Sequence, residues 1–453
     1  MKYQKQTNNR RKAAVEWQDA LKGGSFISWL TIPHIIGLLL VAAYFLRSSI
    51  LVILYPTVGP VLTMAGYFLL GVAFLYTAIS GRQIATAGML FILCCLPGAW
   101  FSEQSDNSMQ KFGGLALLVM VAGPVVQGEK ASKLRSGAWT TALFLTVVIG
   151  TASCLWWWLR LPVLGLGSFS GVTVHANTLG PLAGLGGIIA VSKSIFSRKQ
   201  TQIVWLFLAG ACCFSCVASA ARVSIVAMLV SLAVVVILER RKIQLNLVTV
   251  SLLGIVLCWS GYHFVESKEV FSNATGSLQE KGFENTRELL WNARLKEFMD
   301  HPYWGVGIGI GEGGEDEGVA LDDRGKVNVE PGSSYLAIAS MTGLSGITGF
   351  GILFLWVGGK WISRYHFLPP RHAALLFGVG VFMALDGVAE GWVLAVGSPL
   401  CLIFWIWLGI VLDSVNLPQF PPQKTATRIR SGRQSGIESL AGNNSSLGGQ
   451  FHE

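Results

Sequence analysis

The chain has 453 residues, of which 52% are hydrophobic and only 13% are charged, and its formal net charge is +9. Soluble globular proteins usually carry about 25% charged residues. This composition therefore excludes an ordinary soluble protein and predicts an all-α, polytopic transmembrane helical bundle. The positive charge does not indicate a nucleic-acid partner, because the basic residues are gathered in separate loops between apolar runs.

The basic loops set the expected topology, since cytoplasmic loops of membrane proteins are enriched in Lys and Arg. All of them fall on one face if the chain has about 12 spans with both termini in the cytoplasm. The expected spans are 27–46, 62–79, 86–101, 112–127, 137–158, 176–194, 202–219, 222–238, 245–263, 334–358, 371–388 and 392–412.

These spans divide the chain into five regions. They are a basic cytoplasmic N-terminal tail (1–25), spans one to nine (26–263), a large outer loop (264–333), spans ten to twelve (334–412) and a polar, disordered cytoplasmic tail (413–453). Residues 48–62 are apolar but contain two prolines, so we expect an interfacial or re-entrant segment there rather than another span.

The sixth span opens from the outer side with GVTVHANTLGPLAGLGG (171–187). His175 and Asn177 lie where a polar headgroup would enter, although a helix-capping or interfacial role for His175 is the alternative. Further along, CCFSC (212–216) has no nearby His or carboxylate, so we expect cysteines that serve as small packing residues rather than as metal ligands.

Arg222 begins the eighth span and lies at the outer boundary of the hydrocarbon. An Arg in hydrocarbon costs several kcal/mol, so its position needs a reason. Snorkelling to the interface is one explanation. The small residues of SAAR (219–222) also let other helices or a ligand headgroup approach closely, and positive charge is otherwise scarce on this side.

The outer loop 264–333 is acidic, with 14 acidic and 7 basic residues. Within it, residues 285–300 predict a helix that is capped at Asn285 and ended by Pro302. Arg287, Trp291, Arg294 and Phe298 recur on one face. Either this is a salt-bridged surface helix, or the face lies on the membrane domain and meets an anionic group.

The glycine-rich stretch YWGVGIGIGEGGEDEG (303–318) follows this helix, and we expect a flexible loop, because no βαβ unit surrounds it. Its acidic part is expected to be a solvated loop tip. Closer to the C-terminus, Asp386 and Glu390 lie four residues apart at the outer boundary. They either mark a solvated turn or line the same cavity as Arg222.

Four stretches of the chain form a set: GVTVHANTLG (171–180), SAARVSIVAML (219–229), TRELLWNARLKEFMDHPYWGVGIG (286–309) and GSSYLAIASMTGLSGITGF (332–350). In order and spacing they resemble motifs of the O-antigen ligase and O-antigen polymerase superfamily. The resemblance covers roughly residues 170–350, and the first five spans and the tail carry no such signature.

The resemblance implies a metal-independent, inverting glycosyltransferase without a cofactor, in the bacterial inner membrane. Such enzymes take a glycan from an undecaprenyl-pyrophosphate carrier at the outer face and pass it to a glycan or glycolipid acceptor. Arg222 and Arg287 match family arginines that hold the pyrophosphate, a role that suits Arg because it stays protonated and binds two oxygens at once. The expected substrate-binding residues are His175, Asn177, Trp291, Arg294 and Tyr335.

The chain departs from the family at the proton acceptor. The family's histidine aligns with Gly332, and the following asparagine aligns with Ser333. An inverting attack still needs a base, and Glu330 is the substitute we expect, with His175 in reserve; Glu330 as an ordinary member of the acidic loop is the alternative.

Two other functions compete with this interpretation. A transporter or flippase for a lipid-linked glycan would be expected to show internal repeats and polar residues at the midplane. A non-catalytic assembly protein would use the outer loop as a docking surface. The sequence leaves open whether the chain is a ligase or a polymerase.

Overall fold

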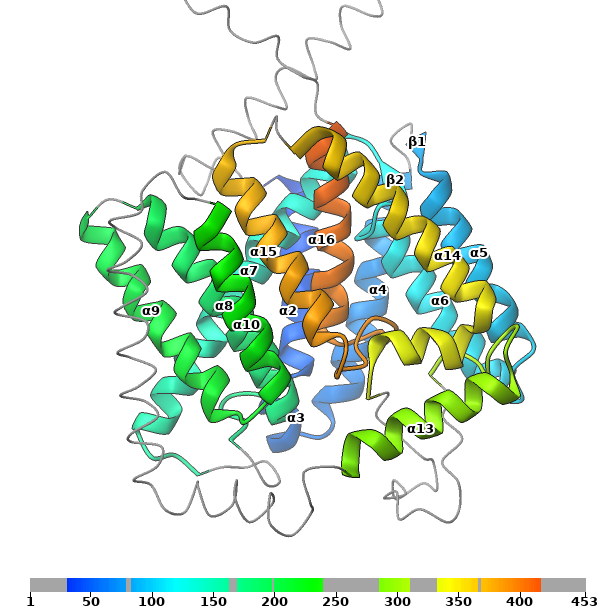
Figure 1. The fold of residues 1–453 in the computed structure, drawn as a ribbon, viewed down its shortest axis with the longest axis horizontal. Helices are drawn as coiled ribbons and strands as arrows, with labels where there is room; N and C mark the ends of the chain where they lie inside the picture. Colours follow the sequence, from blue (N-terminus) through cyan, green and yellow to red (C-terminus); the bar gives the residue numbers. More distant parts are fainter. Residues whose placement is uncertain are drawn as a thin grey trace, which may run out of the picture. The chain divides into compact units, whose positions relative to one another are not determined.

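The computed structural model of this chain describes residues 31–78, 83–162, 169–197, 199–238, 285–309, 332–365 and 368–416. Most of these residues are helical (Figure 1). The helices are α2 (Ile32–Arg47), α3 (Leu51–Leu54), α4 (Val58–Ala78), α5 (Thr86–Trp100), α6 (Ser105–Val121), α7 (Glu129–Trp158), α8 (Ala176–Phe196), α9 (Lys199–Ala218), α10 (Arg222–Leu238), α13 (Asn285–Asp300), α14 (Ser334–Arg364), α15 (Pro370–Asp386) and α16 (Pro399–Asn416). Two short strands, β1 (Gln83–Ile84) and β2 (Val126–Gln127), pair antiparallel.

The all-α, polytopic membrane architecture predicted from composition is confirmed. Within the described residues, six helices are long and apolar enough to cross a membrane, namely α4, α7, α8, α9, α14 and α16. The shorter apolar helices α2, α5 and α10 add to them. The expected span 245–263 lies outside the described residues, and the full number of crossings and the side on which each terminus lies stay predictions.

The expected boundaries need correction at the twelfth span. Its helix, α16, begins at Pro399 and not at residue 392. Residues 387–398 are instead irregular, because Gly397 adopts a positive φ of 105° and Pro399 suits the first turn of a helix. In the segment 48–62, α3 has only four residues. A helix of that length is about 6 Å long and cannot cross a hydrocarbon layer of about 30 Å.

Cysteines pack α9 against its neighbours. Cys212, Cys213 and Cys216 are buried and free. The sulfur of Cys212 lies so close to α7 and α8 that a Cβ added at Gly150 or Gly186 would come within 2.7 and 3.1 Å of it. The prediction that these cysteines act as small packing residues is therefore confirmed.

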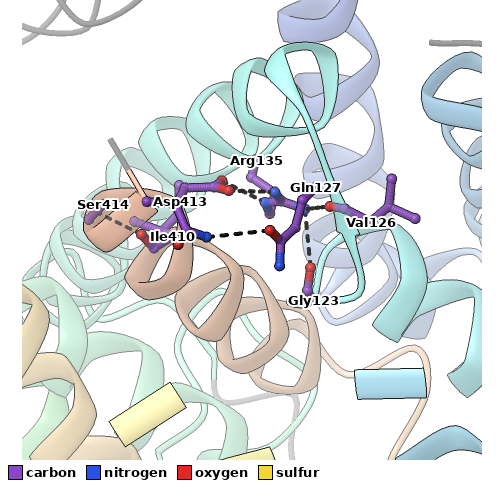
Figure 2. A network of polar contacts seen from close by, with 8 residues as sticks. Gly123, Val126, Gln127, Arg135, Ile410, Asp413 and Ser414 are labelled. Atoms are coloured by element: carbon purple, nitrogen blue, oxygen red, sulfur yellow. Dashed lines mark hydrogen bonds and ion pairs between the residues drawn. The ribbon is translucent and has the colours of Figure 1, made fainter. Parts of the chain in front are cut away.

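A buried ion pair fastens α7 to α16 (Figure 2). Arg135 is fully buried, and its Nε and Nη2 donate to the two carboxylate oxygens of Asp413 at 2.8 and 2.6 Å. Its Nη1 also donates to the carbonyls of Gly123 and Val126, at 3.1 and 2.8 Å. One guanidinium thus holds two helices and the connection between α6 and α7 together.

We expect Arg135→Leu to destabilise the protein by about 3–5 kcal/mol, because it leaves the mostly buried Asp413 carboxylate without a counter-charge. The control is Lys133→Leu on the same helix, which breaks an exposed pair with Glu129 and should cost about 0–1 kcal/mol. Thermal unfolding of the detergent-purified protein measures both, and equal losses in the two variants would contradict the structural role of Arg135.

Candidate active site

Arg222 is the first residue of α10 and follows a tight turn from α9. The chain reverses here because Ala220 adopts a left-handed φ of 57°, which is uncommon for a residue other than glycine. The first amides of a helix have no partner within it, and its N-terminus carries partial positive charge. The exposed side chain of Arg222 adds a full positive charge at this point, so the start of α10 favours an anion.

The start of α8 lies beside this turn. A Cβ added at Gly180 would approach the Ala221 side chain to 2.4 Å and Ser219 Oγ to 2.8 Å, so only glycine fits. His175 is the residue just before α8, and Asn177 lies in its first turn; both side chains are exposed. The structure therefore places the two helix N-termini predicted to meet a headgroup next to each other.

Asp386, at the end of α15, connects three parts of the chain. It is fully buried, and its Oδ1 accepts from Ser224 Oγ at 2.6 Å while its Oδ2 accepts from Trp392 Nε1 at 3.0 Å. Since Ser224 is two residues beyond Arg222, Asp386 fixes the start of α10. Glu390 is buried as well, so of the two alternatives for these residues the solvated turn is wrong.

The start of α14 joins the same region. Ser334 Oγ donates to the carbonyl of Glu390 at 2.6 Å, and the amide of Ser334 donates to the carbonyl of Gly387 at 2.9 Å. The hydroxyl of Tyr335 donates to the carbonyl of Ala384 at 2.8 Å. The ends of α10, α14 and α15 are therefore joined by hydrogen bonds around Asp386.

Helix α13 matches the expected helix 285–300 and reaches the start of α14. Trp291 Nε1 donates to the carbonyl of Gly332 at 3.0 Å. Arg294 is only 1% exposed, and its Nη1 donates to Glu297 Oε2 at 2.8 Å. The salt bridge expected within a surface helix therefore exists, between Arg294 and Glu297, but both side chains are buried. The side chain of Arg287 lies outside the described residues.

Helix α14 is broken at Gly343, where φ is 62° and ψ is −162°. Residues 302–307 fill this break with their backbone. The amides of Val306 and Gly307 donate to the carbonyls of Ser340 and Met341, and the amide of Leu344 donates to the carbonyl of Pro302, over 2.8–3.1 Å. A break in a helix leaves backbone groups that need partners, and this segment supplies them.

The expectation of a flexible loop is therefore wrong for residues 303–309, of which Val306 and Ile308 are buried. Glycine is required at Gly305, where φ is 73° and an added Cβ would lie 2.5 Å from the backbone of Met341. Two features of the sequence could have indicated this contact. They are Gly343 in the middle of an expected span and the alternating glycines of GVGIG (305–309). Residues 310–318, with the acidic tip, lie outside the described residues.

Glu330, the expected base, also lies outside the described residues. Gly332, two residues after it, adopts a positive φ of 65° and lies against Leu290 of α13. Among the described residues, no group of three or more His, Cys, Asp or Glu side chains could hold a metal ion.

Comparison with known families bears on the arrangement around α10, α13 and α14. Residues 205–351 match the family model described as O-antigen ligase. This part of the chain is similar to O-antigen ligases. The predicted resemblance is thereby confirmed for the three motifs that lie within this range, and a comparison with curated proteins gave no match. The matched range includes Arg222, α13, the segment 302–309 and the break in α14. His175, Asn177, Asp386 and Glu390 lie outside it.

We expect Gly305→Ala to lower the thermal stability, because the new methyl group would collide with the backbone of α14, and overpacking of this kind costs about 1–3 kcal/mol. Gly113→Ala on α6 is the matched control, since its added Cβ meets no atom within 4 Å and alanine favours helix. Thermal unfolding should therefore separate the two variants. A Gly305→Ala protein as stable as Gly113→Ala would show that 302–307 does not fill the break.

Proposed function

We propose that this protein is a membrane glycosyltransferase of the O-antigen ligase or polymerase type. It takes a glycan from an undecaprenyl-pyrophosphate carrier at the outer face of the bacterial inner membrane and transfers it to a sugar hydroxyl of a glycan or glycolipid acceptor. The observation that carries the proposal is the position of Arg222 within the family match, at the N-terminus of α10 and two residues from a serine bound to buried Asp386.

The leaving group explains the need for positive charge. When the bond between the sugar C1 and the carrier oxygen breaks, the pyrophosphate gains negative charge. Arg222, the helix N-terminus and Arg287 stabilise that charge without a metal ion. Asp386 acts indirectly, because its hydrogen bond to Ser224 holds the first turn of α10 in place.

The acceptor hydroxyl attacks C1 from the face opposite the pyrophosphate, so the anomeric configuration inverts, and its proton passes to a base. Glu330 is our candidate for this base, with His175 in reserve. The Trp291–Gly332 hydrogen bond supports this assignment, because it holds α13, which carries Arg287 one turn before Trp291, against the backbone two residues after Glu330. His175, Asn177 and Tyr335 complete the proposed substrate site, whereas Trp291 and the buried Arg294 hold α13 in place.

The proposed function is tested by incubating the purified full chain with a polyprenyl-pyrophosphate-linked glycan and a candidate acceptor. A glycosyltransferase forms a new glycan linkage and releases polyprenyl pyrophosphate. A flippase moves the intact donor across a proteoliposome membrane without a new linkage, and a non-catalytic assembly protein does neither.

A deletion strain separates the two types of transferase. Accumulated single-repeat carrier lipid indicates a lost polymerase, and accumulated carrier-linked polymer indicates a lost ligase.

We expect Arg222→Lys to reduce transfer by about 10²–10³-fold, because the charge is kept but the two-oxygen contact is lost. Arg287→Lys should lose activity similarly. Arg160→Lys is the control, since Arg160 is exposed and lies outside the matched domain. Wild-type turnover by the Arg222 and Arg287 variants, at normal protein levels, would rule out these arginines as the pyrophosphate site.

We expect Glu330→Gln to stop transfer while donor binding stays unchanged, because the amide keeps the shape but cannot accept the proton. Glu330→Asp should keep part of the activity. Transfer rates and donor affinities measured on the same samples separate the two effects. Normal transfer by Glu330→Gln together with an inactive His175→Ala would assign the base to His175 instead.

A further inference from the structure

Helix α13 presents three different faces to its surroundings. One face is buried against the rest of the protein and carries Arg294 and Glu297, which are 1% and 4% exposed. A second face is exposed and polar, and it consists of Asn292, Lys296 and Asp300. The third face is exposed but apolar, since Leu295 and Met299 are 45% and 63% exposed. An exposed apolar face of this kind indicates a further contact.

The apolar face of α13 continues onto the end of α5. Tyr303 follows Met299 by four residues and is 68% exposed. The ring of Trp304 packs against the ring of Phe101, with 6.2 Å between the ring centroids. The carbonyl of Trp304 lies so close to α5 that a Cβ added at Gly98 would collide with it. We call the exposed side chains of this region the apolar patch; they are Trp100, Phe101, Leu295, Met299, Tyr303 and Trp304.

The apolar patch adjoins the exposed side of α5. Leu93 and Trp100 are exposed and lie on the same face of α5, because their spacing is almost two helical turns. Since α5 is an apolar helix of the membrane-spanning bundle, we expect this face to contact lipid. The helix has 15 residues, and a helix of that length spans about 22 Å of a hydrocarbon layer of about 30 Å. We therefore expect Trp100 and Phe101 close to the edge of the hydrocarbon.

The position and composition of α13 agree with a place at that edge. Figure 1 shows α13 across the end of the bundle, where it contacts α14. Helices that lie in the membrane interface turn an apolar face toward the acyl chains and a polar face toward water. Trp and Tyr are enriched at this depth, and they supply three of the six side chains of the apolar patch.

We propose that the apolar patch docks α13 in the interface of the membrane that the protein spans, with ordinary phospholipid as its occupant. The acyl chains cover Leu295, Met299 and the aromatic rings, while the polar face of α13 stays in water. Such a phospholipid undergoes no reaction, so the contact does not depend on the proposed function. Its consequence is that the membrane surface sets the position of α13, the helix that carries Arg287.

The test places the photoreactive residue p-benzoylphenylalanine at single positions of the full-length protein in nanodiscs of phosphatidylethanolamine and phosphatidylglycerol. Leu295→p-benzoylphenylalanine and Met299→p-benzoylphenylalanine probe the apolar face of α13. Lys296→p-benzoylphenylalanine is the matched control on the polar face, and Leu93→p-benzoylphenylalanine is the positive control on α5. All four side chains are exposed, so the bulky group needs no space in the core.

After irradiation, we expect phospholipid adducts at positions 93, 295 and 299, with yields several-fold above the yield at position 296. The mass of the intact protein measures each adduct. Crosslinks between two copies of the chain at position 299, without lipid, would assign the apolar patch to a protein interface and overturn the inference. Lipid yields at positions 296 and 299 that are equal, or no adduct at position 299, would overturn it as well.

Hydrogen exchange in the same nanodiscs measures the effect of lipid on α13 itself. We expect Leu295→Gln combined with Met299→Gln to speed amide exchange in α13 by about 10-fold, because lipid contact then favours the folded helix less. Asn292→Gln combined with Lys296→Gln is the control on the polar face and should exchange like the wild type. Equal exchange in the two double variants would show that lipid does not hold α13 and would overturn the inference.

Discussion

The break in α14 at Gly343 is the constraint on which the candidate site depends. A membrane offers no water to satisfy the backbone groups that a broken helix releases, so another part of the protein must supply their partners. The backbone of 302–307 does so, with amides that reach Ser340 and Met341. Because these residues follow α13 directly, filling the break also fixes α13, and the Trp291–Gly332 hydrogen bond holds its other half against the start of α14.

A second constraint is the buried carboxylate of Asp386. A buried polar group is costly unless hydrogen bonds satisfy it, and here the donors come from α10 and from the irregular segment after α15. The hydrogen bond from Ser224 to Asp386 holds the N-terminus of α10 at the point where α14 begins and α15 ends. The positive end of α10 and Arg222 are thereby presented on a rigid support, which an electrostatic site requires. At the other end of the bundle, Arg135 performs a comparable structural task through Asp413 (Figure 2).

Much of this arrangement was readable from the sequence, for physical reasons. Apolar runs predicted the helices well because a membrane leaves little choice of secondary structure, and Arg222 marked the start of α10 correctly. The burial of Asp386 and Glu390 could not be predicted from the sequence, because their hydrogen-bond partners Ser224 and Ser334 come from distant parts of the chain. The packing of residues 303–309 against α14 could not be predicted for a similar reason. Glycine permits both a flexible loop and a close backbone contact, and only the presence of the broken helix α14 beside it decides between them.

We propose that the anionic headgroup of a lipid-linked donor binds at the N-terminus of α10. A cryo-EM structure of the full chain with bound undecaprenyl pyrophosphate would locate the headgroup. We expect phosphate oxygens within about 3 Å of the Arg222 guanidinium. A pyrophosphate bound at the opposite end of the helices instead, beside Lys193 near the end of α8 and Arg371 at the start of α15, would contradict it.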